Sequence, residues 1–334
     1  MLFNIVIYNH GLKREFSYLL EPLIDPLCRA IGKAGHDVLI SFDQFHCGAI
    51  NLLVEHFVTH RSILEDIVKA KNAGAKIGVL ATELIIDGEI PYAKGGISCL
   101  DRKGNAIIEE DFDNYIYNRI IGFSKVLQHA DFAWSLFERT MPFCRKFCKN
   151  VQSLQYGYQE PFRPVANIEK DIDVLFFGGA TSYRKTVLQS IAEQGIGVLA
   201  VGGGFPTGRM PDILLDSLID RSRIIVNLTL NGPPSGDDSI DSRIVSHTRV
   251  STLLSRGACV ISEEVPFDNP YWPYLINVEP SLIPIRCKQL LKSGKSQAIV
   301  RRNAERFKTE MDAGAIMVRV IRDTFHPAAT HRPA

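Results

Sequence analysis

The sequence has no apolar run that approaches the ~20 residues needed to cross a membrane. Its first residues, MLFNIVIYNHG, lack the basic segment that opens a signal peptide, so we expect them to form a first strand. Charge of one sign is not in excess either, because 38 Lys and Arg residues balance 37 Asp and Glu residues. That balance argues against a nucleic-acid scaffold or a polybasic membrane anchor. We therefore predict a cytoplasmic protein without a nucleic-acid partner, for which peripheral membrane contact stays open.

Metal and nucleophile motifs are also missing. The seven cysteines are odd in number and scattered, which suits reduced thiols. Cys144 and Cys148 lie four apart and would share a helix face, but no second pair is nearby to complete a zinc site. The chain also has no HExxH, EF-hand, P-loop, GxGxxG or nucleophile-elbow pattern. We expect no bound metal and no separate cofactor.

What is present is a repeated α/β rhythm. Apolar strand patterns at 4–8, 38–42 and 76–81 alternate with helical patterns, of which 61–72 is the clearest. This βαβ order is typical of a parallel sheet with helices on both faces. Residues 87–114 fit the rhythm poorly, and the turn-forming DRKGN within them suggests a hairpin on the rim of the sheet.

A second series of the same kind follows a proline-containing linker at 159–171. Strand patterns recur at 173–177, 197–201 and 223–230, each followed by turn residues and a helical pattern. A chain of 334 residues is long enough for two domains. We predict an α/β protein with two Rossmann-like, doubly wound domains, 1–160 and 171–325, in which the C-terminal helix could pack back on the first domain.

The segment RVSTLLSRGACVISEE, 249–264, is the unit around which the second domain is organised. Its apolar positions have helical spacing up to Gly257, which suits a helix C-cap, and ACVIS then has the pattern of a buried strand. Ligands of open α/β sheets bind beyond the carboxyl ends of the strands. The unit therefore directs Arg249 and Glu263 at a ligand site, although a salt bridge at a strand end is the alternative.

Two glycine-rich turns offer a phosphate site. In GGATSYRK, a strand is followed by Gly178, Gly179 and Ser182 and then by the start of a helix expected at 186–194, so that backbone N–H groups and the helix dipole favour an anion. Arg184 adds positive charge close by. The second turn contains Gly203. Ordinary turn chemistry explains the first glycine run equally well, and a flexible connection explains the second run somewhat better than ligand binding does.

Candidate bases follow the strands of the first series. Glu83 and His10 come after strand patterns and could deprotonate an acceptor hydroxyl, although for either one alone a role outside catalysis is the more common case. Asp43 and His46 are weaker candidates of the same kind. His247, at the start of the later helix, could donate to a phosphate, although a lone histidine is more often structural.

At these residues the chain resembles the GT-B glycosyltransferases, in particular enzymes of the spore-maturation-protein type. The resemblance rests on DVLFFGG with a following arginine, on RSRIIVNLTL, on Arg249 eight residues before Gly257, and on ACVISEE. It covers 171–279 and the helical tail, while the first half fits mainly by rhythm, with ADFAWSLFERT similar to the family's late strand and helix.

The resemblance implies two Rossmann-like domains that face each other across a cleft, with a nucleotide sugar such as a UDP- or GDP-sugar on the second. It implies a metal-independent hexosyltransferase of polysaccharide biosynthesis, acting on a glycan, lipid-linked or protein-linked hydroxyl. Glu83 and His10 are then the candidate catalytic residues. The donor-binding candidates are Gly178, Gly179, Ser182, Arg184, Gly203, Asn227, His247, Arg249, Thr252 and Glu263.

One departure from the family pattern keeps alternatives open. Thr252 stands where many members carry a glutamate that binds the donor ribose. A threonine hydroxyl can still form a hydrogen bond, but without charge assistance. A catalytically silent nucleotide- or sugar-binding protein and a nucleotide-sugar epimerase of the same architecture are therefore the competing interpretations.

Overall fold

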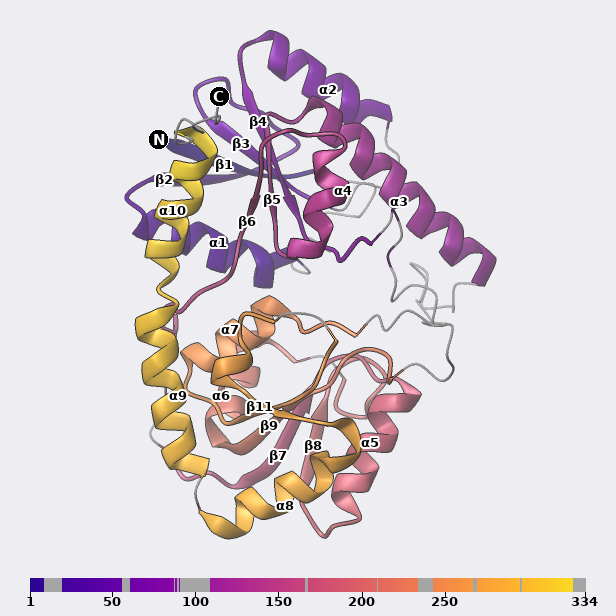
Figure 1. Ribbon diagram of the computed structural model, residues 1–334, viewed down its shortest axis with the longest axis vertical. Helices are drawn as coiled ribbons and strands as arrows, with labels where there is room; N and C mark the ends of the chain where they lie inside the picture. The colour runs from indigo at the N-terminus through magenta and orange to yellow at the C-terminus, as the bar shows by residue number, and fades with distance from the viewer. Residues whose placement is uncertain are drawn as a thin grey trace, which may run out of the picture. The chain divides into compact units, whose positions relative to one another are not determined.

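The computed structural model describes residues 1–8, 20–55, 61–86, 88, 90, 109–165, 168–208, 210–233, 243–266, 269–294 and 296–326 (Figure 1), with backbone alone at 21, 61–62 and 109–118. The chain forms two compact units. The first contains Met1–Tyr156 and Ala313–Ala334, and the second contains Gly157–Asp312.

In the first unit, the described residues form a six-stranded parallel sheet. Its strands, in spatial order, are β2 (Asp37–Phe42), β1 (Leu2–Ile7), β3 (Ile50–Val54), β4 (Lys76–Ala81), β5 (Phe132–Ser135) and β6 (Val151–Ser153). The helices are α1 (Glu21–Lys33), α2 (Arg61–Asn72), α3 (Glu109–His129), α4 (Met141–Arg145) and α10 (Ala313–Phe325), with a 3-10 turn at Glu138–Thr140. Strand β3, INLLV, is buried throughout, as expected for a central strand covered on both faces.

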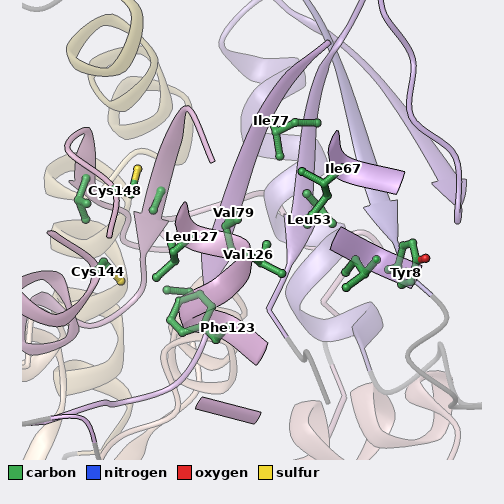
Figure 2. Close-up of a cluster of buried hydrophobic side chains, with 14 of the residues drawn as sticks. Tyr8, Leu53, Ile67, Ile77, Val79, Phe123, Val126, Leu127, Cys144 and Cys148 are labelled. Atoms are coloured by element: carbon green, nitrogen blue, oxygen red, sulfur yellow. The ribbon is translucent and has the colours of Figure 1, made fainter. Parts of the chain in front are cut away.

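Two helix layers cover this sheet. Helices α2, α3 and α4 pack on one face, where Ile67, Val79, Phe123 and Leu127 share one core (Figure 2). Helices α1 and α10 pack together on the other face (Figure 1). The last helix is fastened there by Trp134, whose Nε1 donates to Thr324 Oγ1 at 2.9 Å.

In the second unit, the described residues form a five-stranded parallel sheet. Its strands, in spatial order, are β11 (Ile276–Val278), β10 (Val260–Glu263), β9 (Ser222–Asn227), β7 (Ile172–Phe177) and β8 (Val198–Val201). The helices are α5 (Ser182–Ala192), α6 (Asp212–Arg221), α7 (His247–Ser255), α8 (Ile283–Ser293) and α9 (Ser296–Glu310), with 3-10 turns at Trp272–Tyr274 and Pro280–Leu282.

Alternate side chains of β7 enter different cores. Phe176 packs with residues of α5 and α8, and its neighbour Phe177 packs with residues of α6, α7 and α9. Successive strand residues point to opposite faces, so the two cores lie on opposite sides of the sheet. Both units are therefore sheets between helix layers, which confirms the predicted α/β class.

Two local predictions were wrong at their edges. Helix α3 begins at Glu109, so the last part of the hairpin expected at 87–114 is helical, and most of the remainder lies outside the described residues. Helix α4 ends at Arg145, so Cys148 lies beyond it. Cys144 and Cys148 are buried free thiols, and burial raises the pKa of each. Among the described helices, none is both long and apolar enough to span a membrane.

A substitution at Gly78 of β4 tests how tightly the first sheet is packed. A Cβ at this position would lie 2.1 Å from Cζ of Phe132 on the paired strand β5. We predict that Gly78→Ala lowers the free energy of unfolding by about 1–3 kcal/mol, because the Phe132 ring is fixed by its neighbours. Urea denaturation measures this. The control is Gly32→Ala in α1, where nothing lies within 4 Å and stability should hold or rise. Equal effects of the two substitutions would contradict the packing.

Candidate functional site

The loops that follow neighbouring strands of the second unit meet at the carboxyl edge of its sheet. The loops after β7 and β8 are in backbone contact there. Gly178 N–H donates to Val201 O at 2.9 Å, and Ala180 N–H donates to Gly203 O at 2.8 Å. Gly202 has a φ of +133°, and a Cβ on it would lie 2.1 Å from the Gly178 carbonyl oxygen. Close backbone approach thus requires glycine at position 202, whereas nothing lies within 4 Å of a Cβ on Gly179 or Gly203.

Two arginines reach this edge from opposite faces of the sheet. Arg184 comes from α5, and its guanidinium carbon lies 5.4 Å from the centre of the Phe176 ring. Arg249 comes from α7, and its guanidinium carbon lies 5.1 Å from the centre of the Phe177 ring. A Cβ on Gly178 would be 3.2 Å from Arg249 Nη2 and 3.5 Å from Arg184 Nη1. The two cations therefore both border Gly178, where β7 ends.

The donors of Arg184 are used within the protein. Its Nε donates to Thr229 O at 2.8 Å, its Nη1 to Gly179 O at 2.8 Å and its Nη2 to Leu228 O at 2.9 Å. The side chain is buried, and burial lowers its pKa to about 10. Arg184 thus ties the loop after β7 to the end of β9, which is a structural role.

Arg249 is held less tightly. Its Nη1 donates to Asn227 Oδ1 through a long hydrogen bond of 3.5 Å. Among the described residues, no carboxylate lies within ion-pair distance of Arg249. Burial, together with repulsion from Arg184, lowers the pKa of Arg249 to about 10. The guanidinium nevertheless stays charged at neutral pH, so this edge presents a positive charge with unused donor capacity.

Glu263 has its acceptors filled by protein donors. Its carboxylate accepts from Thr229 N–H at 2.9 Å, from Thr229 Oγ1 at 2.8 Å and from the Tyr183 hydroxyl at 3.1 Å, and it pairs with Arg243 Nη1 at 3.3 Å. Burial raises its pKa, and the bonds from Thr229 oppose that rise. Glu263 therefore holds the turn after β9. Sequence analysis did not single out its three partners, which are Thr229, Tyr183 and Arg243.

The remaining donor-side candidates occupy different environments. Ser182 is the first residue of α5, behind the N-cap Thr181, whose Oγ1 accepts from Arg184 N. Gly203 and Thr252 are exposed. His247 is buried against the Tyr271 ring, with centroids 5.3 Å apart, and burial lowers its pKa to about 4. Its imidazole is neutral at pH 7 and adds no positive charge.

In the first unit, Glu83 lies two residues beyond β4 and is ion-paired with Arg119 of α3 at 2.7 Å. Arg119 also binds Glu55, which directly follows β3. Sequence analysis did not single out Glu55, although its place directly after an apolar strand could have indicated it. His10 lies outside the described residues. Asp43 has a φ of +54°, and the His46 N–H donates to Asn51 Oδ1.

No known protein-family model matches this sequence, and no curated protein matches it. Solved structures do match. A mutant of the T4 phage BGT, in complex with UDP-glucose, shares 12% identity and a TM-score of 0.54, over 98% of this chain and 100% of that one. AviGT4, a glycosyltransferase involved in avilamycin A biosynthesis, shares 14% identity and a TM-score of 0.52, over 97% of each chain. TarM matches with a TM-score of 0.51 and 6% identity, over 82% of this chain and 54% of its own.

The chain has the GT-B fold. Its two parallel-sheet units and the near-complete coverage of two of these glycosyltransferases support that assignment together. At 6–14% identity, the likeness concerns the fold and does not transfer a substrate. The narrower resemblance to the spore-maturation-protein type stays a prediction.

The contact between the two glycine turns predicts a sharp difference between adjacent positions. We expect Gly202→Ala to lower the free energy of unfolding by more than about 2 kcal/mol, since its Cβ would collide with the Gly178 carbonyl at a positive φ. Gly203→Ala is the control, because nothing lies within 4 Å of a Cβ there. We expect a change below ~0.5 kcal/mol for it. Similar unfolding midpoints for both variants would contradict the arrangement.

His247 predicts a dependence of stability on pH. Its folded-state pKa of about 4 lies below the ordinary value of 6.5, so the unfolded chain binds the proton more tightly. Stability from this group is therefore present above pH 6.5 and is lost as the pH falls towards 4. We expect His247→Phe to remove about 2 kcal/mol of the destabilisation seen between pH 7 and pH 5. Urea denaturation at both pH values measures it, and an identical pH dependence in the variant would show that His247 is not buried.

Proposed function

We propose that this protein is a glycosyltransferase that moves a sugar from a nucleoside diphosphate sugar to a hydroxyl acceptor. One observation carries the proposal: the Arg249 guanidinium borders the glycine turn after β7 and has no carboxylate in ion-pair range among the described residues. The fold supports it, because a β-glucosyltransferase and the glycosyltransferase AviGT4 each match 97% of this chain.

The electrostatics of this edge favour an anionic ligand. A partly buried cation without an ion-pair partner is unfavourable, and a second guanidinium at the same glycine adds repulsion. A diphosphate would relieve both costs, since guanidinium groups bind phosphate oxygens through parallel hydrogen bonds. The N-terminus of α5, which starts beside this turn, adds backbone N–H groups of the favourable dipole end.

The residues at this edge then have one of two roles: some contact the diphosphate, and others hold the backbone of the turn in place. Arg249 is the direct diphosphate contact, and the turn Gly178–Gly179 with Ser182 lies beside the phosphates. Arg184 and Glu263 hold that turn and the end of β9 through the bonds described above, and Asn227 Nδ2 donates to Ser262 Oγ of β10 at 3.0 Å. Stabilising the departing diphosphate lowers the barrier to sugar transfer, because the leaving group gains negative charge in the transition state. Glu83 or His10 takes the acceptor proton.

The finer assignments follow the neighbours and the sequence. We propose a uridine nucleotide as donor, since the T4 phage BGT was solved with UDP-glucose. The acceptor is a hydroxyl of a glycan or of a lipid- or protein-linked sugar. The structural match to a DNA-modifying β-glucosyltransferase makes duplex DNA a necessary member of the acceptor screen. The balanced charge of this chain predicts that DNA is not modified.

Metal independence is part of the proposal. The described residues contain no group of three or more metal-ligating side chains, whereas the T4 phage BGT was also solved with UDP and Mn²⁺. Arginine and backbone donors can replace a metal in neutralising the diphosphate. Turnover after EDTA treatment should therefore equal turnover with added Mn²⁺.

Arg249→Ala tests the proposal directly. We expect UDP or GDP to raise the melting temperature of the native protein, and we expect Arg249→Ala to abolish that rise and to lower transfer by roughly 10²-fold or more. Arg249→Lys should recover only part, because lysine cannot form parallel bonds to a phosphate. The control is Arg301→Ala on the exposed side of α9. Differential scanning fluorimetry with UDP, GDP, CMP and TDP, followed by donor turnover, gives both readouts.

The outcomes separate the competing functions. Unchanged nucleotide binding and turnover in Arg249→Ala would refute the assignment. Nucleotide binding without consumption of any donor would favour the silent binding protein that Thr252 suggests. Conversion of a lone nucleotide sugar, without acceptor, into its isomer would identify an epimerase.

A further inference from the structure

The first unit contains a buried ion triad at the carboxyl ends of two adjacent strands. Arg119 donates from Nε to Glu55 Oε1 at 2.8 Å and from Nη2 to Glu55 Oε2 at 2.8 Å. The same Nη2 lies 2.7 Å from Glu83 Oε1. One guanidinium is therefore shared by two carboxylates, and its pair with Glu55 is bidentate.

The three members differ in their access to solvent. The side chains of Glu55 and Arg119 are 2% and 9% exposed, whereas that of Glu83 is 19% exposed. Glu55 is further fixed by Thr82, whose Oγ1 donates to Oε2 at 2.8 Å. Glu55 and Arg119 thus form the buried part of the triad, in which Glu55 is held by both Arg119 and Thr82. The Glu83 carboxylate is the part of the triad that reaches the surface.

The backbone of Glu83 is fixed independently. Thr140 Oγ1 donates to the Glu83 carbonyl at 2.8 Å and accepts from Ile85 N–H at 2.9 Å. Both ends of this glutamate are therefore tied, one through its main chain and the other through Arg119. A carboxylate held in this way loses little entropy when a hydroxyl approaches it.

We propose that Arg119, anchored by Glu55, is a positioning residue that fixes the Glu83 carboxylate for the acceptor hydroxyl. This inference rests on the proposed transferase function and chooses Glu83 over His10 as the base. Glu55 acts on Glu83 through Arg119, because its two hydrogen bonds hold the guanidinium in the orientation in which Nη2 reaches Glu83.

In the reaction, the acceptor oxygen forms a bond to the anomeric carbon of the donor sugar. The bond between that carbon and the diphosphate oxygen breaks, and its electron pair leaves with the diphosphate. The hydroxyl proton passes to Glu83, which becomes neutral and later returns it to solvent. Arg119 stays protonated throughout and keeps its bidentate pair with Glu55, so the triad does not lose its anchor when Glu83 is neutralised.

Chemical rescue tests this role. Glu83→Ala should lower transfer by about 10²-fold or more, as expected for loss of a general base. Added formate should restore transfer in proportion to its concentration, because Arg119 Nη2 can hold a small carboxylate at the vacated position. In Glu83→Ala combined with Arg119→Lys, formate should no longer rescue. The matched control is Glu83→Ala combined with Lys125→Arg, an exposed position of the same helix, in which rescue should persist.

The outcomes distinguish this inference from the proposed function. Melting temperatures and the thermal shift with UDP establish that each variant is folded and binds nucleotide. Rescue that survives Arg119→Lys, or an active wild type whose Glu83→Ala variant formate does not restore, would overturn the positioning role alone. A wild type that consumes no donor would overturn the proposed function and this inference with it.

A second measurement avoids the double variant. Arg119→Lys alone should lower kcat while the KM for the donor stays unchanged, because the donor is held by the second unit. Loss of activity that instead follows the fraction of unfolded protein would show a purely structural role for Arg119 and would contradict the inference.

Discussion

Arg249 brings a positive charge to the carboxyl edge of the second sheet without a carboxylate in ion-pair range among the described residues. Ring contact with Phe177 and a long bond to Asn227 hold the guanidinium there without neutralising it. A protein gains no stability from such a group, and the proposed diphosphate would supply the negative charge that it lacks. Each donor-side assignment depends on this one charge.

The rest of the second unit keeps that edge in place. Gly178 and Gly202 permit the loops after β7 and β8 to touch, Arg184 joins the β7 loop to the end of β9, and Glu263 gathers donors from the β9 turn and α5. Two of these charged residues, Arg184 and Glu263, have internal partners that account for their burial. Their bonds show how a fold can use charged side chains near a site as supports, and why a charge in the right loop is not by itself a ligand contact.

The sequence predicted the α/β class because both series repeat a strong strand–helix rhythm, and the bounds of α2 and β4 agree with those expected at 61–72 and 76–81. It also indicated the edge of the sheet at which Gly178, Arg249 and Glu263 would meet, because parallel strands end together. It could not tell that Arg184 is satisfied by carbonyls whereas Arg249 is not, since that difference depends on the path of the β9 turn.

Partners that are distant in sequence were also beyond prediction. Glu55 and Arg119 are separated by 64 positions, and only the fold brings them together beside Glu83. The hairpin expected within 87–114 shows another limit: turn-forming residues suggested a local structure, yet helix α3 begins inside that range. Local patterns predicted elements well where the apolar period was long, and less well where turn residues were the main signal.

A crystal structure of the protein with UDP tests the central claim most directly. The account predicts difference density for a diphosphate at the turn Gly178–Gly179, with phosphate oxygens within hydrogen-bond distance, about 2.7–3.2 Å, of the Arg249 guanidinium. Clear density for UDP elsewhere on the chain, with Arg249 in contact only with protein atoms, would contradict it.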